Sequence, residues 1–385
     1  MTIRSDKGKI TVFIFGIVFF AACQFGSENS SESGNSGAPK NDRANLSSPS
    51  PSPKFTPSSS RIKIAAGGDV MLGSPVPNDK HMPPNDGKDL LKPVTPIFQL
   101  ADLAFANLEG PLADGGISEK CKPESKFCFA FRMPTRYAAY LKAAGLDVVS
   151  VANNHALDFG DAGRASTRKA LDAAGIKHAG SDSGKFSTAY FEVNGKTIAV
   201  IGFAHNRVSL NINNIVSARR AVETADRNAD IVIVSFHGGS EGTNAQRVPN
   251  RTEVYLNEER GNLPRFARAV VDAGADLVLG HGPHVLRGME IYKDRLIAYS
   301  LGNFAIYGWF KLAGPTATTL VLEVDLDQEG KFIGGKIHPF KLRSWGFLTP
   351  DKTNAAVSIV RRLSLLDFPG SAPVISGNGI IDPRS

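Results

Sequence analysis

The chain has 385 residues, of which 42% are hydrophobic and 21% are charged, and this composition is that of a globular protein able to bury a large core. The formal net charge of +7 is small for this length and is compatible with an anionic substrate or surface. No basic run with interleaved aromatic residues occurs in the sequence, which argues against a nucleic-acid-binding groove.

The first 23 residues have the pattern of an export signal. Three basic residues precede an apolar stretch from Ile10 to Ala22, which is too short to span a bilayer comfortably. Two alanines then precede Cys23, and small residues directly before a cysteine resemble the lipobox of bacterial lipoproteins. We therefore expect residues 1–23 to form a signal peptide and Cys23 to carry lipid. Phe20 replaces the usual aliphatic residue, which leaves ordinary cleavage nearby or an uncleaved anchor as alternatives.

Residues 24–60 consist largely of Ser, Asn, Pro and Gly, so burial of apolar side chains cannot offset the entropy of ordering them. We expect this segment to be a disordered tether that holds a folded domain at some distance from a membrane. The folded part is expected to be one domain at residues 61–345, followed by a C-terminal helix and tail at residues 346–385. These features together predict an exported cell-envelope protein that is lipid-anchored to a membrane.

Three predicted strands deliver polar side chains to one edge of a sheet. Each is a short apolar run that ends in a carboxylate, an amide or an imidazole. The predicted strands and the polar residues at their ends are 61–72 with Asp69, 103–108 with Glu109, and 147–152 with Asn153, Asn154 and His155.

A helix that ends at glycine and is followed by a β-branched strand occurs twice, at residues 141–147 and 271–276. This repeat predicts a largely parallel α/β sheet, in which ligands bind beyond the carboxyl ends of the strands. The pair Asn194-Gly195 predicts a hairpin, and the residues after His284 alternate in a way that favours antiparallel strands. Helices are expected at residues 134–144, 161–174, 216–227, 259–273 and 353–367.

Four histidines follow apolar runs in similar settings, which indicates a metal site. These histidines are His155, His237, His281 and His284. The expected metal ligands are Asp69, Glu109, Asn154, His237, His281 and His284. This mixed set suits one or two ions of Mn²⁺, Fe²⁺ or Zn²⁺ better than Ca²⁺ or Mg²⁺. The structural alternatives are that Asp69 caps a turn, that Glu109 is a solvated turn residue and that His281 only orients His284.

Other side chains near these motifs are candidates for substrate binding or structural support. Glu241 lies four residues after His237 and is expected to be a loop carboxylate, with a supporting position behind the metal ligands as the alternative. Cys121 and Cys128 lie in a polar loop, and export would favour a disulfide between them over free thiols. The candidate substrate-binding residues, for which ordinary structural or surface roles are the alternative, are Ser300, Asn303 and Arg287.

Six segments in this order closely resemble the CapA, or poly-γ-glutamate capsule synthesis, family, and the resemblance covers about residues 61–345. The segments are GGDVMLG, ANLEGPL, SVANNHALDFG, HGGSEG, GHGPHVLRG and YSLGNF. The family looks like a branch of the calcineurin-like metallophosphoesterases. The resemblance therefore implies an α/β fold, a sandwich of two mixed β-sheets flanked by helices, with a dinuclear metal centre at the strand ends.

The resemblance also implies roles for individual residues. Asp69 stands at the position of the first metal aspartate, and Glu109 replaces the carboxylate that bridges two metals. His155 takes the position of the general acid or transition-state donor. The remaining implied ligands are the amide of Asn154 and the imidazoles of His237 and His284. The sequence departs from the phosphoesterase pattern in three places: Met71 replaces the histidine of Asp-x-His, Asn107-Leu-Glu109 replaces an Asp-based motif, and the last two histidines are three residues apart.

The implied function is synthesis, export, anchoring or trimming of an anionic surface polymer such as poly-γ-glutamate. As an enzyme, the protein would use metal-activated attack on an amide or phosphoester. The alternative from another class is a non-catalytic lipoprotein component of a membrane polymer-synthase complex, which Met71 and the loosened last motif favour.

Overall fold

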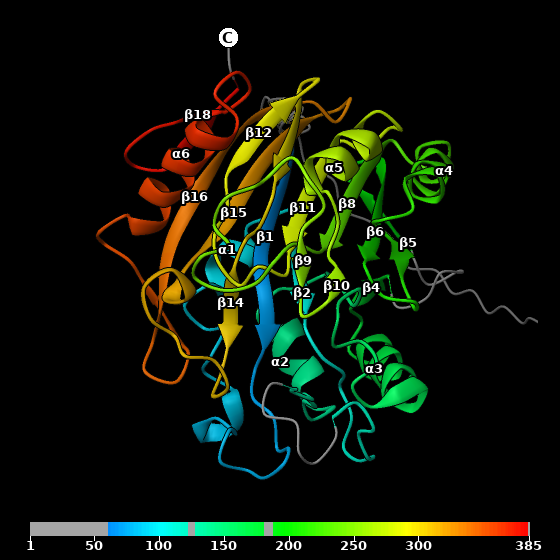
Figure 1. Cartoon of the computed structure of the whole chain (residues 1–385), viewed down its shortest axis with the longest axis vertical. Coiled ribbons are helices and arrows are strands. Elements are labelled where there is room, and N and C mark those ends of the chain that lie inside the picture. Colours follow the sequence, from blue (N-terminus) through cyan, green and yellow to red (C-terminus); the bar gives the residue numbers. More distant parts are fainter. Residues whose placement is uncertain (1–60, 122–127, 181–187, 384–385) are drawn as a thin grey trace, which may run out of the picture. The chain divides into compact units, whose positions relative to one another are not determined.

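We describe residues 61–121, 128–180 and 188–383 of a computed structural model (Figure 1). The predicted signal peptide, the lipid attachment at Cys23 and the tether lie outside the described residues. None of the helices within the described ranges has the length and hydrophobicity needed to cross a membrane.

The first sheet is mixed and has ten strands in the order β18-β19-β16-β15-β1-β2-β3-β4, with β14 paired to β1 and β17 paired to β16. Its parallel half is β1 to β4, and its antiparallel half is built on β15 and β16. The strands are β1 (Arg61–Met71), β2 (Leu103–Leu108), β3 (Val148–Ser150), β4 (Lys177–Ala179), β14 (Asn303–Ile306), β15 (Thr318–Asp327), β16 (Phe332–Arg343), β17 (Phe347–Pro350), β18 (Val374–Ile375) and β19 (Ile380–Asp382).

The second sheet has seven strands in the order β12-β13-β11-β8-β6-β5, with β7 paired to β6. Its hairpin turn at Asn194-Gly195 has two positive φ angles, 51° and 79°, as the sequence predicts for a tight β-turn. The strands are β5 (Thr188–Val193), β6 (Lys196–Ala204), β7 (Leu210–Asn211), β8 (Ile231–His237), β11 (Leu277–His281), β12 (Met289–Tyr292) and β13 (Arg295–Ala298). A separate ribbon consists of β9 (Val254–Tyr255) and β10 (Glu258–Glu259).

Five α-helices among the described residues cover the outer faces of the two sheets, and the last α-helix packs on the apolar core that the sheets share. The α-helices are α1 (Thr95–Gln99), α2 (Tyr137–Ala143), α3 (Gly160–Ala173), α4 (Ile215–Asp226), α5 (Leu263–Val271) and α6 (Ala355–Asp367), and the 3₁₀ turns are η1 (Pro84–Gly87) and η2 (Gly314–Ala317). The prediction that α5 begins at residue 259 is wrong. Glu258 and Glu259 pair with β9, and the helix begins after Asn262, whose side chain accepts a hydrogen bond from the Arg265 amide at 3.1 Å.

Three apolar cores hold the layers together. Ile62 and Phe105 of the first sheet share a core with Ile233 and Leu279 of the second, so the two sheets pack face to face. The other face of the first sheet packs on α1 to α3, and the other face of the second packs on α4 and α5. The predicted fold class, a sandwich of two mixed sheets flanked by helices, is therefore confirmed. Strands β17 to β19 also join the first sheet, so the segment after residue 345 is part of the same fold.

Aspartates at the start of four parallel strands fix the alignment of neighbouring strands. Each accepts a hydrogen bond of 2.8 to 3.0 Å from the backbone amide of the adjacent strand. The four residues are Asp102, Asp147, Asp230 and Asp276. Because these bonds align the amino ends of neighbouring strands, the carboxyl ends also lie side by side at one edge of each sheet. The polar residues lie at these edges.

Strand β1 changes partner at Gly67-Gly68. Residues 61–66 pair antiparallel with β15, whereas Asp69 begins a parallel pairing with β14, and its amide donates to the Gly302 carbonyl at 2.9 Å. A Cβ atom on Gly68 would lie 2.0 Å from that same carbonyl oxygen. Only glycine therefore lets β14 approach closely enough to place Asp69.

We predict that Gly68→Ala lowers the free energy of unfolding by about 3 kcal/mol, because the added methyl group separates two hydrogen-bonded strands. The matched control is Gly334→Ala in β16, where the nearest atom to a new Cβ is 3.7 Å away. That control should change the free energy of unfolding by less than about 1 kcal/mol. Urea unfolding followed by circular dichroism measures both, and equal effects of the two changes would contradict the account.

Candidate metal centre

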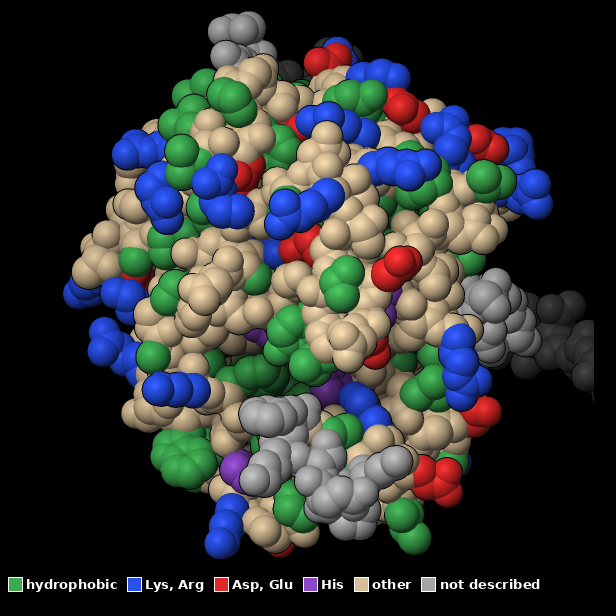
Figure 2. Space-filling model, viewed as in Figure 1, with side chains coloured by type: hydrophobic (Ala, Val, Ile, Leu, Met, Phe, Trp, Pro, Cys, Tyr) green, Lys and Arg blue, Asp and Glu red, His purple; other side chains and the backbone are tan. Residues whose placement is uncertain are grey.

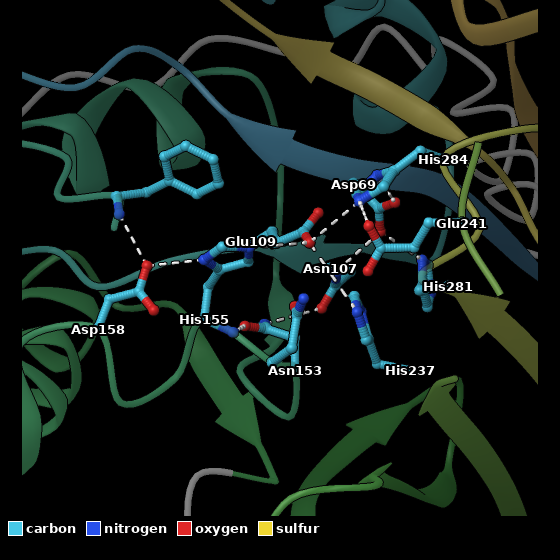
Figure 3. Close-up of polar contacts among 12 residues, drawn as sticks. Asp69, Asn107, Glu109, Asn153, His155, Asp158, His237, Glu241, His281 and His284 are labelled. Carbon is cyan, nitrogen blue, oxygen red and sulfur yellow. Dashed lines mark hydrogen bonds and ion pairs between the residues drawn. The ribbon is translucent and has the colours of Figure 1, made fainter. Parts of the chain in front are cut away.

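Four strands bring carboxylate and imidazole groups to one buried point (Figure 3). Asp69 lies near the end of β1, and Glu109 follows β2 directly. His237 and His281 are the last residues of β8 and β11, and the ladder between these strands pairs them with each other. All four residues have no exposed surface. The parallel ladders thus place residues from widely separated motifs next to one another.

Asp69 contacts two histidines through its two oxygens. Its Oδ1 lies 3.4 Å from His281 Nδ1 and accepts a hydrogen bond of 2.8 Å from Asn107 Nδ2, while its Oδ2 lies 3.2 Å from His284 Nδ1. Burial acts to raise the pKa of Asp69, but the hydrogen bonds and charges of the two histidines outweigh it and hold this pKa well below its usual range. Asp69 is therefore an anion.

Glu109 lies at the centre of the group. Its Oε1 is 3.6 Å from His284 Nε2 and 3.9 Å from the Nε2 atoms of both His155 and His237. Both oxygens are buried and have no hydrogen-bond partner among the described residues, and burial raises the pKa of Glu109 well above its usual value. A carboxylate in this position needs a cation to offset its desolvation.

The raised pKa of His284 also indicates that the buried carboxylates require a positive charge beside them. Burial disfavours its charged form, but the carboxylates of Glu109, Asp69 and Glu241 outweigh burial and raise its pKa to about 10. Its Nδ1 lies 3.0 Å from Asn303 Oδ1, and its backbone is left-handed with φ 58°. Burial lowers the pKa of the neighbouring His237, so that imidazole is neutral and able to bind a metal.

The donor set fits a divalent metal ion. Two atoms bound to one ion at about 2.1 Å each, at a tetrahedral angle, lie about 3.4 Å apart. The distances between the nitrogen and oxygen atoms of Asp69, Glu109, His284 and the neighbouring histidines are 3.2 to 3.9 Å. Most of these distances are long for hydrogen bonds, yet they are close to the distance of about 3.4 Å expected of two atoms that share a metal ion. Buried polar atoms normally have hydrogen-bond partners, but within residues 61–121, 128–180 and 188–383 the following have none: Asp69 Oδ2, both Glu109 oxygens, Asn154 Oδ1, and both ring nitrogens of His237 and His281. Such mixed oxygen and nitrogen donors suit Mn²⁺, Fe²⁺ or Zn²⁺.

Asn107 and Asn153 link these groups through hydrogen bonds that the sequence did not reveal. Asn153 Nδ2 donates to the Leu108 carbonyl at 2.8 Å and to Asn107 Oδ1 at 3.2 Å, and its Oδ1 accepts from the His155 amide at 3.1 Å. Asn107 in turn donates to Asp69. The two asparagines therefore fix the positions of Asp69 and His155 relative to each other. The two consecutive asparagines in SVANNH could have indicated this network, but the sequence predicted a role for Asn154 only.

His155 is oriented by two residues that the sequence analysis also missed. Its Nδ1 lies 2.7 Å from Asp158 Oδ2, and Lys120 Nζ lies 2.5 Å from Asp158 Oδ1. The Phe131 amide donates to Asp158 at 2.7 Å. Burial lowers the pKa of His155 more than Asp158 raises it. The spacing of His155 and Asp158 in HALD could have indicated this pair, whereas nothing in the sequence places Lys120 beside it.

A cleft with a volume of about 450 Å³ opens over His155 and His284. Figure 2 shows a hollow in which histidine side chains are visible between hydrophobic ones. One group of lining residues is aromatic, and another is charged. The first comprises Phe129, Phe131, Tyr255 and Phe310, and the second comprises Lys120, Glu241, Glu258 and Arg260. Asn154 also lines the cleft, as expected for a ligand facing the substrate.

The three residues predicted to bind substrate do not line this cleft. Arg287 is buried, bonds both oxygens of Glu253 at 2.8 Å and bonds the Ala245 carbonyl at 2.7 Å, so its guanidinium holds a loop. Ser300 Oγ accepts from the Gly302 amide at 3.2 Å. Asn303 orients His284 and donates to the Thr316 carbonyl. These contacts give all three side chains structural partners, and a substrate-binding role for them stays a prediction.

Cys121 and Cys128 form a disulfide with a Cα–Cα distance of 5.5 Å. Lys120 precedes the first cysteine, and both Lys120 and Cys128 line the cleft. The disulfide therefore lies beside the residues that orient His155.

Comparison with known proteins gives a consistent result. The family model described as bacterial capsule synthesis protein PGA_cap matches residues 63–307. The capsule biosynthesis protein CapA of Bacillus anthracis is 30% identical over 268 residues, which are 65% of this chain and 61% of that protein. The PGA biosynthesis protein CapA of Bacillus subtilis (strain 168) is 32% identical over 266 residues, which are 63% of each protein. The chain thus matches less than two thirds of the length of either relative.

Among solved structures, the 5'-nucleotidase precursor from Thermus thermophilus is similar at 14% identity and a TM-score of 0.39, over 72% of this chain and 54% of that one.

We predict that Glu109→Gln is at least as stable as the wild type in EDTA, because it removes a carboxylate whose burial is unfavourable and whose oxygens accept no hydrogen bond from the described residues. With Mn²⁺ at 100 times its dissociation constant, the wild type should gain about 2.7 kcal/mol, and the variant much less. Urea unfolding with and without Mn²⁺ measures this reversal. The control, Glu323→Gln, removes a carboxylate that pairs with Lys63 at 3.1 Å and should have the same effect with and without metal. A wild type that no divalent ion stabilises would contradict the assignment.

Proposed function

The chain belongs to the bacterial capsule synthesis protein PGA_cap family, and from this premise we propose that it acts on an anionic cell-surface polymer. The polymer is of the poly-γ-glutamate type, and the role is its synthesis, export, anchoring or trimming by a metal-dependent hydrolase or transferase. The observation that carries the proposal is the set of buried, unpartnered carboxylate and imidazole atoms directly beneath an open cleft. Such a set is costly to bury unless it binds a cation that a substrate can reach.

In this proposal, one or two divalent ions are held by Asp69, Glu109, Asn154, His237, His281 and His284. When bound, the metal would polarise the bond under attack and lower the pKa of a bound water to about 7. The protein contributes fixed ligand positions, because the parallel ladders and the asparagine network leave the ligands little freedom. It also excludes bulk water from the ligands, which are buried below the cleft.

His155 is the proposed proton donor to the leaving group. Its Nδ1 faces Asp158, so its Nε2 is the ring atom directed toward Glu109 and the centre. Asp158 holds the orientation of the ring, and Lys120 in turn holds Asp158. A donor oriented by a buried carboxylate in this way is suited to acid catalysis of amide or phosphoester cleavage.

The same proposal assigns the protein to the cell envelope. The two relatives are named for capsule or PGA biosynthesis, and the pattern at residues 1–23 is that of an exported lipoprotein with lipid on Cys23. A tether at residues 24–60 would let the domain reach a polymer or its precursor near a membrane, within reach of a polymer-synthase complex.

The second candidate function is a non-catalytic component of a membrane polymer-synthase complex. One observation favours it: Met71 packs in the apolar core of the first sheet, so β1 supplies one metal ligand, Asp69. The two functions differ in a cell that lacks this gene. An Asp69→Ala/His284→Ala double variant restores the polymer if the role is structural, and it fails to restore the polymer if the centre is catalytic.

We predict that His155→Gln lowers kcat at least about 100-fold on γ-linked glutamate oligomers or aryl phosphoesters, with KM and metal content little changed, because it removes proton donation alone. Asp158→Asn should give a smaller fall in kcat, since it affects the orientation of the ring. The control is His338→Gln on β16, where the imidazole contacts Glu323 outside the cleft. Steady-state kinetics with parallel elemental analysis measures all three, and unchanged kcat in His155→Gln would remove this role.

A further inference from the structure

Glu241 lies on a glycine-rich loop that bends over the centre. The loop follows β8 and His237, and Gly239 and Gly242 have φ angles of 84° and 98°. The Gly239 amide donates to the Arg260 carbonyl at 2.7 Å, and the Gly242 amide donates to the Pro283 carbonyl at 3.0 Å. The loop is therefore fastened on both sides of Glu241, and one of these bonds is to the residue that precedes His284.

The two oxygens of Glu241 have different surroundings. Its Oε1 accepts a hydrogen bond of 2.9 Å from Arg260 Nη1. Its Oε2 lies 3.8 Å from His284 Nε2, the same nitrogen that lies 3.6 Å from Glu109 Oε1. Within the described part of the chain, Oε2 makes no hydrogen bond. Two carboxylates from different elements thus approach one imidazole nitrogen at distances typical of atoms that share an ion, as in Figure 3.

Arg260 explains why one oxygen stays available. Its side chain is almost fully buried and bonds Glu258 through Nε at 2.9 Å and Nη2 at 2.8 Å. Its guanidinium also lies over the Tyr255 ring, 5.3 Å from the centroid. Because Nε and Nη2 of Arg260 bond Glu258, Arg260 bonds Glu241 through Nη1 alone. This contact orients the carboxylate and leaves Oε2 directed at the histidines.

From this geometry we infer that Glu241 is a further ligand of the metal centre, held in place by Arg260. The inference rests on the metal centre of the proposed function. Glu241 lines the cleft, so it forms the substrate-facing side of the centre, opposite the fully buried Asp69 and Glu109. A third carboxylate shifts the donor set toward oxygen, which favours Mn²⁺ or Fe²⁺ over ions that prefer sulfur or nitrogen alone.

The test is the affinity of the full chain for Mn²⁺, measured by isothermal titration calorimetry on the wild type, Glu241→Gln and the matched control Glu258→Gln. Both variants remove one carboxylate that pairs with Arg260, but only Glu241 approaches His284. We expect the dissociation constant to rise at least tenfold in Glu241→Gln and less than twofold in Glu258→Gln. Thermal unfolding in EDTA should be alike for both variants, which separates loss of a ligand from loss of the loop. The electron paramagnetic resonance spectrum of bound Mn²⁺ should change in Glu241→Gln alone.

The outcomes are distinguishable. A wild type that binds no divalent ion would overturn the metal centre and the proposed function with it. A wild type that binds Mn²⁺, together with equal affinities in Glu241→Gln and the wild type, would overturn only the assignment of Glu241. Equal losses of metal affinity in both variants would show that the two carboxylates affect metal binding only through Arg260. This result would also overturn the assignment of Glu241 as a ligand.

Discussion

Burying two carboxylates beside three imidazoles is the constraint on which the rest of this structure depends. Asp69 and Glu109 have no exposed surface, and in the part of the chain that the structure describes the oxygens of Glu109 have no hydrogen-bond partner. Desolvation of such groups costs several kcal/mol each, which the fold must offset by a nearby positive charge. In the protein alone, that charge is the proton on His284, whose pKa is raised to about 10. A divalent cation would meet the same need more fully and would release that proton.

The surrounding fold can be understood as support for this buried group. The aspartates that align the parallel strands bring His237 and His281 side by side, and Gly68 lets β14 lie against the end of β1. Hydrogen-bonded residues then orient the groups that face the cleft: Asp158 orients His155, and Arg260 orients Glu241. The result is a rigid set of buried charged groups beneath an aromatic and charged cleft, which is the arrangement that the proposed metal centre requires.

Local patterns made the fold and the ends of the strands predictable. The apolar run at residues 103–108 and the Asn-Gly hairpin matched the structure closely, because short-range periodicity and turn chemistry determine such elements. Partners far apart in the chain were not predictable: Lys120 contacts Asp158 only through tertiary folding. The partner of Arg287 was not predictable for the same reason, since nothing in its own motif shows that it pairs with Glu253. Arg260 likewise bonds only one of the two oxygens of Glu241, and only the three-dimensional structure shows this.

The most direct test is anomalous X-ray diffraction from crystals of the protein grown with Mn²⁺, recorded on both sides of the manganese absorption edge. The account predicts one or two anomalous peaks within bonding distance of Asp69, Glu109 and the histidines at the ends of β8 and β11. An ordered, correctly folded site without an anomalous peak, or a peak bound only elsewhere on the protein, would contradict it.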